Sequence, residues 1–312
     1  MAHPKITIVG AGNVGATCAL WAAARGLGDV VLVDVVEGLA EGKALDLAQA
    51  APIAGFAHKI TGTTDYAATA GSRLAIVTAG LARRPGMSRD DLLAKNAGIV
   101  SGVVQSLVRA SPDVTLIIVS NPVDAMTALA HRASGLPTSR VVGMAGVLDS
   151  ARLRAFIAME AGIGPDQVEA LVLGGHGDSM VPLVRHSTIG GRPLAERLPK
   201  ETIERIIERT RGAGAEIVSS LKTGSAFYAP AAAAVEMAQA ILRDERRVLP
   251  CAAYCDTEYG VGGYFVGVPA RLGAEGVLEV VELDLTEGER AAFAKSVEHV
   301  KSLVAKLDGL GA

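Results

Sequence analysis

Apolar residues in the first half of the chain come in short β-branched runs, separated by longer stretches rich in Ala and Leu. This alternation predicts the strands of a parallel sheet that is covered by helices. Helix Val14–Ala24, closed by Arg25-Gly26, is one such connection. The pattern therefore predicts an α/β fold with an N-terminal doubly wound parallel sheet. Its expected strands are Ile6–Val9, Val30–Asp34, Lys59–Gly62, Leu74–Thr78, Thr115–Val119 and Val141–Gly143.

After about residue 145 the pattern becomes a less regular mixture of helices and strands. Thr286 and Glu289 form a capping box ahead of a helix with an apolar stripe. We expect two domains, residues 1–145 with the parallel sheet and residues 146–312 as an α+β substrate domain. Expected elements of the second part are helix Ser150–Gly162, strand Val168–Leu173, amphipathic stretches Glu201–Leu221 and Ala231–Arg243, strands Tyr264–Val268 and Val277–Leu283, and the stripe Phe293, Val297, Val300 and Val304.

Composition narrows the class of protein. Half of the 312 residues are hydrophobic and the net charge is −3, so a folded chain is expected and nucleic acid is not an expected partner. The apolar runs are short, and the start, Met1–Lys5, lacks the layout of a signal peptide, so we expect a cytoplasmic protein that is not bound to a membrane. The three cysteines, Cys18, Cys251 and Cys255, are an odd and sparse set that argues against disulfides, and no His or second Cys pair lies near Cys251 and Cys255 to complete a metal site.

A Gly-rich turn follows the first expected strand. Gly10 permits a tight turn, Gly12 lets the backbone approach a pyrophosphate, and Gly15 allows close packing of helix on strand. The next strand ends in Asp34, whose carboxylate would bind an adenosine ribose and repel a 2′-phosphate. The sequence therefore predicts a Rossmann domain that binds NAD rather than NADP. The turn consists of Gly10, Ala11, Gly12, Asn13, Val14 and Gly15.

Four further segments contain candidate catalytic residues: residues 81–92, Val119-Ser120-Asn121-Pro122, Leu148-Asp149-Ser150-Ala151-Arg152 and Gly174-Gly175-His176-Gly177-Asp178. Together with the Gly-rich turn, and in this order along nearly the whole chain, they resemble the malate/lactate dehydrogenase family, in particular its lactate-dehydrogenase-like branch. The resemblance implies hydride transfer between NAD and a 2-hydroxy acid, most simply (S)-malate, giving oxaloacetate and NADH.

His176 is the natural proton donor and acceptor, because imidazole titrates near the working pH and this ring lies in a Gly-flanked turn after an apolar strand. The resemblance implies that Asp149 accepts the N–H of His176 and that Arg152 grips the C1 carboxylate of the substrate. From spacing alone, Asp149 and Arg152 could equally form a surface ion pair one helical turn apart.

Residues 81–92 resemble a lid, although an Arg cluster of this kind could also be an ordinary solvated loop. The resemblance implies that Arg89 polarises the reacting carbonyl. It also implies that Arg83 pairs with the distal carboxylate of malate, whereas Arg84 is assigned no role. Asn121 is implied to bind the substrate and the cofactor, and Gly224-Ser225 borders the substrate pocket in relatives. Further implied cofactor contacts are Asn96, Val119 and Ser120.

Alternatives remain open. A lactate or other 2-hydroxy-acid dehydrogenase shares every motif except Arg83. An inactive NAD-binding scaffold would be expected to lack His176, Arg89 or Arg152, all of which are present. An NAD-dependent glycosidase is disfavoured because its Cys and His metal ligands are lacking in the first half. Relatives form homodimers or homotetramers, and the apolar helix face around Trp21 could serve either assembly.

Overall fold

The computed structural model describes residues 3–81 and 89–309, so the predicted lid residues Arg83 and Arg84 lie outside the described residues. The backbone of Arg89 begins a helix, but its side chain is not among those described. The helices are α1 (Asn13–Ala24), α2 (Leu39–Ala54), α3 (Arg89–Ala110), α4 (Val123–Ser134), α5 (Gly146–Ala161), α6 (Leu194–Arg197), α7 (Lys200–Leu221), α8 (Tyr228–Leu242) and α9 (Glu287–Gly309).

A nine-stranded sheet in the order β14-β13-β12-β6-β5-β4-β1-β2-β3 organises the fold. Strands β1 to β6 are parallel and match the six predicted strands to within a residue or two, which confirms the doubly wound sheet. Its strands are β1 (Lys5–Val9), β2 (Asp29–Val33), β3 (Ile60–Thr63), β4 (Leu74–Val77), β5 (Thr115–Ile118), β6 (Val141–Gly143), β12 (Arg247–Cys255), β13 (Tyr264–Gly273) and β14 (Gly276–Val280).

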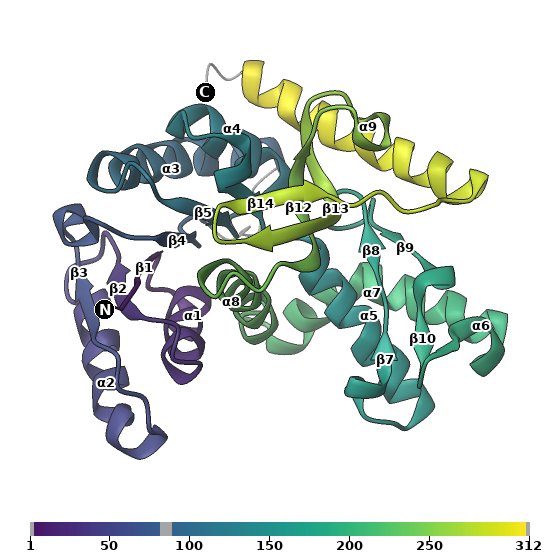
Figure 1. Cartoon of the computed structure of the whole chain (residues 1–312), viewed down its shortest axis with the longest axis horizontal. Coiled ribbons are helices and arrows are strands. Elements are labelled where there is room, and N and C mark those ends of the chain that lie inside the picture. Colours follow the sequence, from purple (N-terminus) through teal and green to yellow (C-terminus); the bar gives the residue numbers. More distant parts are fainter. Residues whose placement is uncertain (1–2, 82–88, 310–312) are drawn as a thin grey trace.

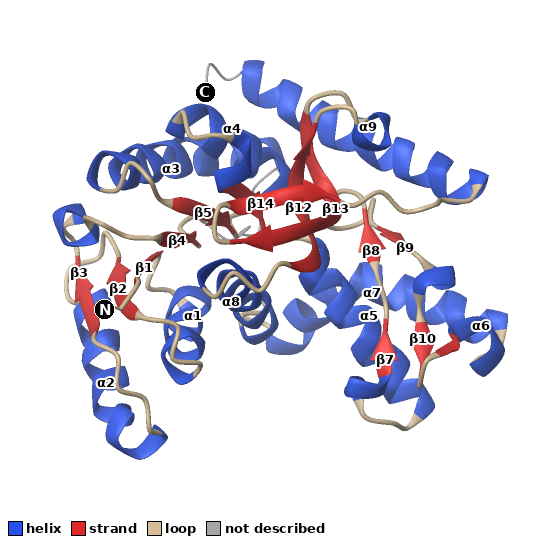
Figure 2. Cartoon of the chain, in the orientation of Figure 1, coloured by secondary structure: helices blue, strands red, loops and turns tan. Residues whose placement is uncertain are grey.

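Helices cover both faces of this sheet, as its continuous apolar strands require. Figure 1 shows α3, α4 and α9 on one side of the sheet and α1 and α8 on the other. The remaining strands are short and lie in the lobe that contains α5 to α7 (Figure 2). They are β7 (Val168–Glu169), β8 (Val172–Leu173), β9 (Val181–Pro182), β10 (Thr188–Ile189) and β11 (Arg192–Pro193).

Local sequence signals placed two helix ends correctly. The helix α1 ends at Ala24, and Gly26 adopts a left-handed φ of 62° just beyond it. At the start of α9, Thr286 and Glu289 exchange hydrogen bonds: Thr286 N–H donates to Glu289 Oε2 at 2.9 Å, and Glu289 N–H donates to Thr286 Oγ1 at 3.2 Å. The predicted stripe of α9 is buried. Both predictions are confirmed.

Other boundaries were wrong. The run Val168–Leu173 is not one strand, because β7 pairs with β10 whereas β8 pairs with β9 in another sheet. Helix α5 begins at Gly146, one turn before the predicted start, so Asp149 lies in its first turn. The nine-residue strand β12 was not predicted. It pairs antiparallel with β6 on one side and antiparallel with β13 on the other, so it connects β13 to the large sheet. The large sheet therefore continues past residue 145.

Among the described residues, no helix is both long and apolar enough to cross a membrane.

Candidate active site

The Gly-rich turn connects β1 to α1 at the carboxyl edge of the sheet, where ligands of open α/β sheets bind. Gly10 has φ +101°, and a Cβ there would lie 2.6 Å from Thr78 Oγ1. A Cβ on Gly15 would lie 1.7 Å from the carbonyl oxygen of Gly10, so this helix-to-strand contact excludes any side chain. A Cβ on Gly12 would meet nothing within 4 Å, so the backbone there is open to an approaching group.

The N-terminus of α1 suits an anion. Its N-cap, Gly12, provides no side-chain hydrogen bond, and the first turn contains no acidic residue. The first backbone N–H groups of the helix are therefore available to phosphate oxygens. Asp34 lies beside the same turn, where its Oδ2 accepts the N–H of Ala11 at 2.6 Å and its Oδ1 accepts the N–H of Val36 at 3.0 Å. Each carboxylate oxygen keeps a free lone pair for a ribose hydroxyl. These residues fit NAD.

Asn96, Ser120 and Asn121 meet at the carboxyl ends of β4 and β5. The buried amide of Asn96 donates to the carbonyl of Asn121 at 2.7 Å and accepts the N–H of Leu81 at 2.8 Å. Asn96 thus joins the start of the predicted lid to the segment after β5. The hydroxyl of Ser120 donates to the carbonyl of Ala79 at 2.5 Å. In this structure Asn96 and Ser120 bind backbone, so they position the segments around them.

His176, Asp149 and Arg152 come together although His176 is far from the other two in sequence. Nδ1 of His176 lies 2.8 Å from Oδ2 of Asp149, whose side chain is 2% exposed. The other oxygen, Oδ1, lies 3.5 Å from Nη1 of Arg152, one turn further along α5. The expected contact of His176 with Asp149 is present, and the Asp149–Arg152 pair is buried rather than a surface ion pair. Nε of Arg152 is buried and has no hydrogen-bond partner among the described residues, so its guanidinium can still bind an anion.

Charges around His176 set its protonation. Burial alone would lower the pKa of this imidazole, but the Asp149 carboxylate, with a smaller contribution from Asp124, raises the pKa above its ordinary value. Arg152 acts in the opposite direction. Because Asp149 binds Nδ1, the Nε2 nitrogen is the one that can exchange a proton with a substrate. The arrangement is that of a general acid and base.

One residue of this cluster was missed from the sequence. The carboxylate of Asp124, in the first turn of α4, accepts the backbone N–H of His176 at 2.9 Å. Burial raises the pKa of Asp124 to about 6, although His176 counteracts part of this effect. The only sequence signal was its place three residues after Asn121, an acidic residue in the first turn of a helix.

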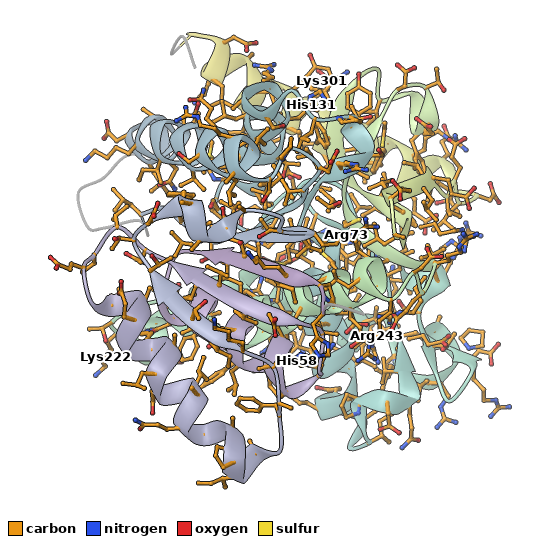
Figure 3. The ribbon with its side chains drawn as sticks, turned by 60° about the vertical axis from the view of Figure 1, so that its left-hand side comes forward. His58, Arg73, His131, Lys222, Arg243 and Lys301 are labelled. Carbon is orange, nitrogen blue, oxygen red and sulfur yellow. The ribbon has the colours of Figure 1, made fainter. Side chains whose placement is uncertain are left out.

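Three other described histidines, His3, His58 and His131, make ring contacts outside this cluster. His58 packs edge-on against His3 with ring centroids 4.6 Å apart, and His131 packs on Phe265 at 5.5 Å. Figure 3 shows His58 and His131 in separate parts of the molecule. Cys18, Cys251 and Cys255 are buried as free thiols, and burial raises the pKa of Cys18 to about 12. Gly224-Ser225 lies exposed between α7 and α8.

Known proteins match this fold and sequence over nearly the full chain. A family model described as lactate/malate dehydrogenase, NAD binding domain, matches residues 4–143, and its partner, the alpha/beta C-terminal domain, matches residues 146–308. A protein of Rhodopirellula baltica named malate dehydrogenase is 57% identical over 312 residues and covers 99% of each chain.

Solved structures agree. The malate dehydrogenase of Salinibacter ruber is 52% identical, with a TM-score of 0.94 over 98% of each chain. The lactate dehydrogenase of Cryptosporidium parvum, complexed with lactic acid and NAD, is 41% identical, with a TM-score of 0.95 over 99% of each chain. The chain belongs to the lactate/malate dehydrogenase family.

Proposed function

We propose that the chain is an NAD-dependent malate dehydrogenase that interconverts (S)-malate and oxaloacetate. The observation that supports this function most directly is the buried contact between His176 and Asp149, 2.8 Å long, with the guanidinium of Arg152 beside it. A base with its orienting carboxylate and a cation for a substrate carboxylate are what oxidation of a 2-hydroxy acid requires.

In the direction of malate oxidation, Nε2 of His176 removes the hydroxyl proton from the substrate while Arg152 holds the C1 carboxylate. Asp149 fixes the tautomer of His176 and stabilises the imidazolium that forms. NAD, when bound, supplies the hydride acceptor for C2. In oxaloacetate reduction, the imidazolium of His176 returns its proton to the forming alkoxide, and Arg89 is assigned to polarise the carbonyl. Asn121 is assigned to hold the substrate at the carboxyl edge of the sheet.

Selection of malate over lactate is assigned to Arg83. Oxaloacetate differs from pyruvate by one carboxylate, and the fold does not separate the two activities because it matches enzymes of both names. A charge-assisted pair in a closed site is worth about 3 kcal/mol, and about 1.4 kcal/mol corresponds to a factor of ten. Arg83→Gln should therefore lower kcat/KM for oxaloacetate at least about a hundredfold and spare pyruvate.

The experiment compares NADH oxidation with oxaloacetate and with pyruvate for the wild type, Arg83→Gln and Arg84→Gln. Arg84→Gln is the matched control from the same segment and should resemble the wild type. Unchanged oxaloacetate reduction in Arg83→Gln would leave only the broader 2-hydroxy-acid activity, with lactate dehydrogenase as the alternative.

The proposal also covers the roles of the two domains and the oligomeric state. Residues 1–145 are assigned as the NAD-binding domain, which also provides Arg83, Arg89 and Asn121 to the substrate. Residues 146–312 are assigned as the substrate domain, with His176, Asp149 and Arg152. A homodimer or homotetramer is supported by partly exposed apolar residues such as Leu20 and Trp21 on α1, each 38% exposed. Light scattering during size-exclusion chromatography tests it, and a monomer would contradict it. The expected cytoplasmic location stays a prediction.

A further inference from the structure

We propose that Asp124 is a positioning residue of this site: its buried carboxylate fixes the main chain of His176, and its negative charge favours the imidazolium form of that residue. The inference rests on the proposed function, and it adds a second carboxylate to the one that binds the imidazole ring. It predicts that the charge of Asp124, and not only its hydrogen bond, sets the balance between the imidazole and imidazolium forms of His176.

The loop that presents His176 is held at three successive backbone N–H groups. That of Gly174 donates to the carbonyl of Gly267 in β13 at 2.8 Å, and that of Gly175 donates to Ser296 Oγ in α9 at 2.8 Å. The third, on His176 itself, donates to Oδ2 of Asp124 in α4 at 2.9 Å. Three separate elements therefore fix the loop, and only the contact at His176 is made by a charged side chain.

A charged group is an unusual choice for this contact. Asp124 is 3% exposed, and its Oδ1 is buried with no hydrogen-bond partner among the described residues. A neutral acceptor would hold the N–H equally well, as Ser296 does for Gly175. Leaving a carboxylate oxygen buried without a partner is unfavourable. The hydrogen bond to the loop therefore does not by itself explain why the side chain at this position is charged.

The charged groups that face Asp124 explain why a carboxylate is present there. Among the described residues, the ionisable groups that act on it are His176, from the loop after β8, and Asp149, from α5. Arg152 of α5 acts on His176, whereas α9 and β13 present the neutral Ser296 and the backbone of Gly267. The carboxylate of Asp124 attracts a proton to His176. Since burial raises its own pKa to about 6, Asp124 is charged at neutral pH and above.

The substitution Asp124→Asn tests the charge, because an amide oxygen can still accept the N–H of His176. We expect the pKa of His176, followed by NMR of labelled histidine in the free enzyme, to fall by about half a unit to one unit. Oxaloacetate reduction needs the imidazolium, so its kcat/KM above neutral pH should fall about three- to tenfold. Malate oxidation needs the neutral ring, so its kcat/KM just below neutral pH should rise by a similar factor. This gain should fade as the pH falls through 6, where Asp124 of the wild type itself loses its charge.

The opposite signs in the two directions separate this role from a structural one, which would weaken both directions together. Asp124→Leu also removes the charge, in a shape suited to apolar surroundings, and should lower the pKa of His176 in the same way. Ser296→Ala removes the neighbouring contact without a change of charge, and Thr127→Val removes a buried hydroxyl one turn along α4. Neither control should move this pKa.

An unchanged pKa of His176 in folded Asp124→Asn and Asp124→Leu would overturn the inference. The proposed function fails separately, if the wild type does not reduce oxaloacetate, because the NMR titration does not depend on turnover.

Discussion

Removal of Arg152 offers the sharpest test of substrate binding. Its side chain is 13% exposed, its Nη1 lies 3.5 Å from Asp149, and its buried Nε lacks a partner among the described residues. A carboxylate gripped by such a fork gains one or two charge-assisted hydrogen bonds, each worth about 1.5–3 kcal/mol. The substitution Arg152→Gln should therefore lower kcat/KM for oxaloacetate by roughly two to three powers of ten.

The same substitution should alter His176. Arg152 lowers the pKa of His176, so its loss should raise that pKa and move the pH profile of oxaloacetate reduction towards higher pH. Arg152→Lys keeps the charge without the planar fork, so its kcat/KM for oxaloacetate should lie between those of the wild type and Arg152→Gln.

The assay is NADH oxidation across pH, combined with NADH binding followed by fluorescence. NADH affinity should stay near that of the wild type, because the Gly-rich turn lies elsewhere. Arg205→Gln is the control, since Arg205 on α7 is 65% exposed and pairs with Glu160 at the surface. Wild-type kcat/KM in Arg152→Lys, or a loss confined to NADH binding, would refute the reasoning.

Three further predictions concern the remaining residues. His176→Asn should bind NADH but lose roughly 10²–10⁴-fold in turnover, and normal steady-state rates would identify another proton donor. Because Asp34 lies beside the Gly-rich turn, kcat/KM should favour NADH over NADPH at least about a hundredfold, and equal use of both would contradict the role of Asp34. The pKa of Asp124 rises on folding from 3.8 to about 6, so its contribution to stability is full below pH 3.8 and is lost as pH rises through 6. The free energy of unfolding of Asp124→Asn, minus that of the wild type, should therefore rise by roughly 1–2 kcal/mol from pH 5 to pH 8. Urea denaturation measures this difference, and a difference that does not change with pH would contradict the prediction.

The parts of the fold that local signals determine were predictable. The capping box of Thr286 and Glu289 sets the start of α9 whatever surrounds it. The parallel strands are recognisable because burial on both faces demands a continuous apolar run. Strand β12 contains Arg247 and Pro250, and its place depends on pairing with β13. The break between β7 and β8 likewise reflects a change of partner strand, which no local pattern records.

The candidate site, like the fold, was predictable from the sequence only in part. The contact of His176 with Asp149 could be expected, because the reaction needs a base with an orienting carboxylate and the family resemblance indicated which residues provide it. Asp124 lies 52 residues from His176, and its significance depends on burial beneath a loop from another part of the fold. An acidic residue in the first turn of a helix is common for reasons of helix stability alone. Sequence could not separate these two explanations.

The arrangement of charges around His176 suits a reversible reaction. Malate oxidation needs the neutral imidazole and oxaloacetate reduction needs the imidazolium, so neither form can be strongly excluded at the working pH. Burial and Arg152 favour the neutral ring, whereas Asp149 and Asp124 favour the charged one. Asp149 must also orient the ring, so its place is fixed by geometry. Asp124 binds the main chain of His176 and not its ring, so Asp124→Asn can remove the charge while an oxygen still accepts that N–H.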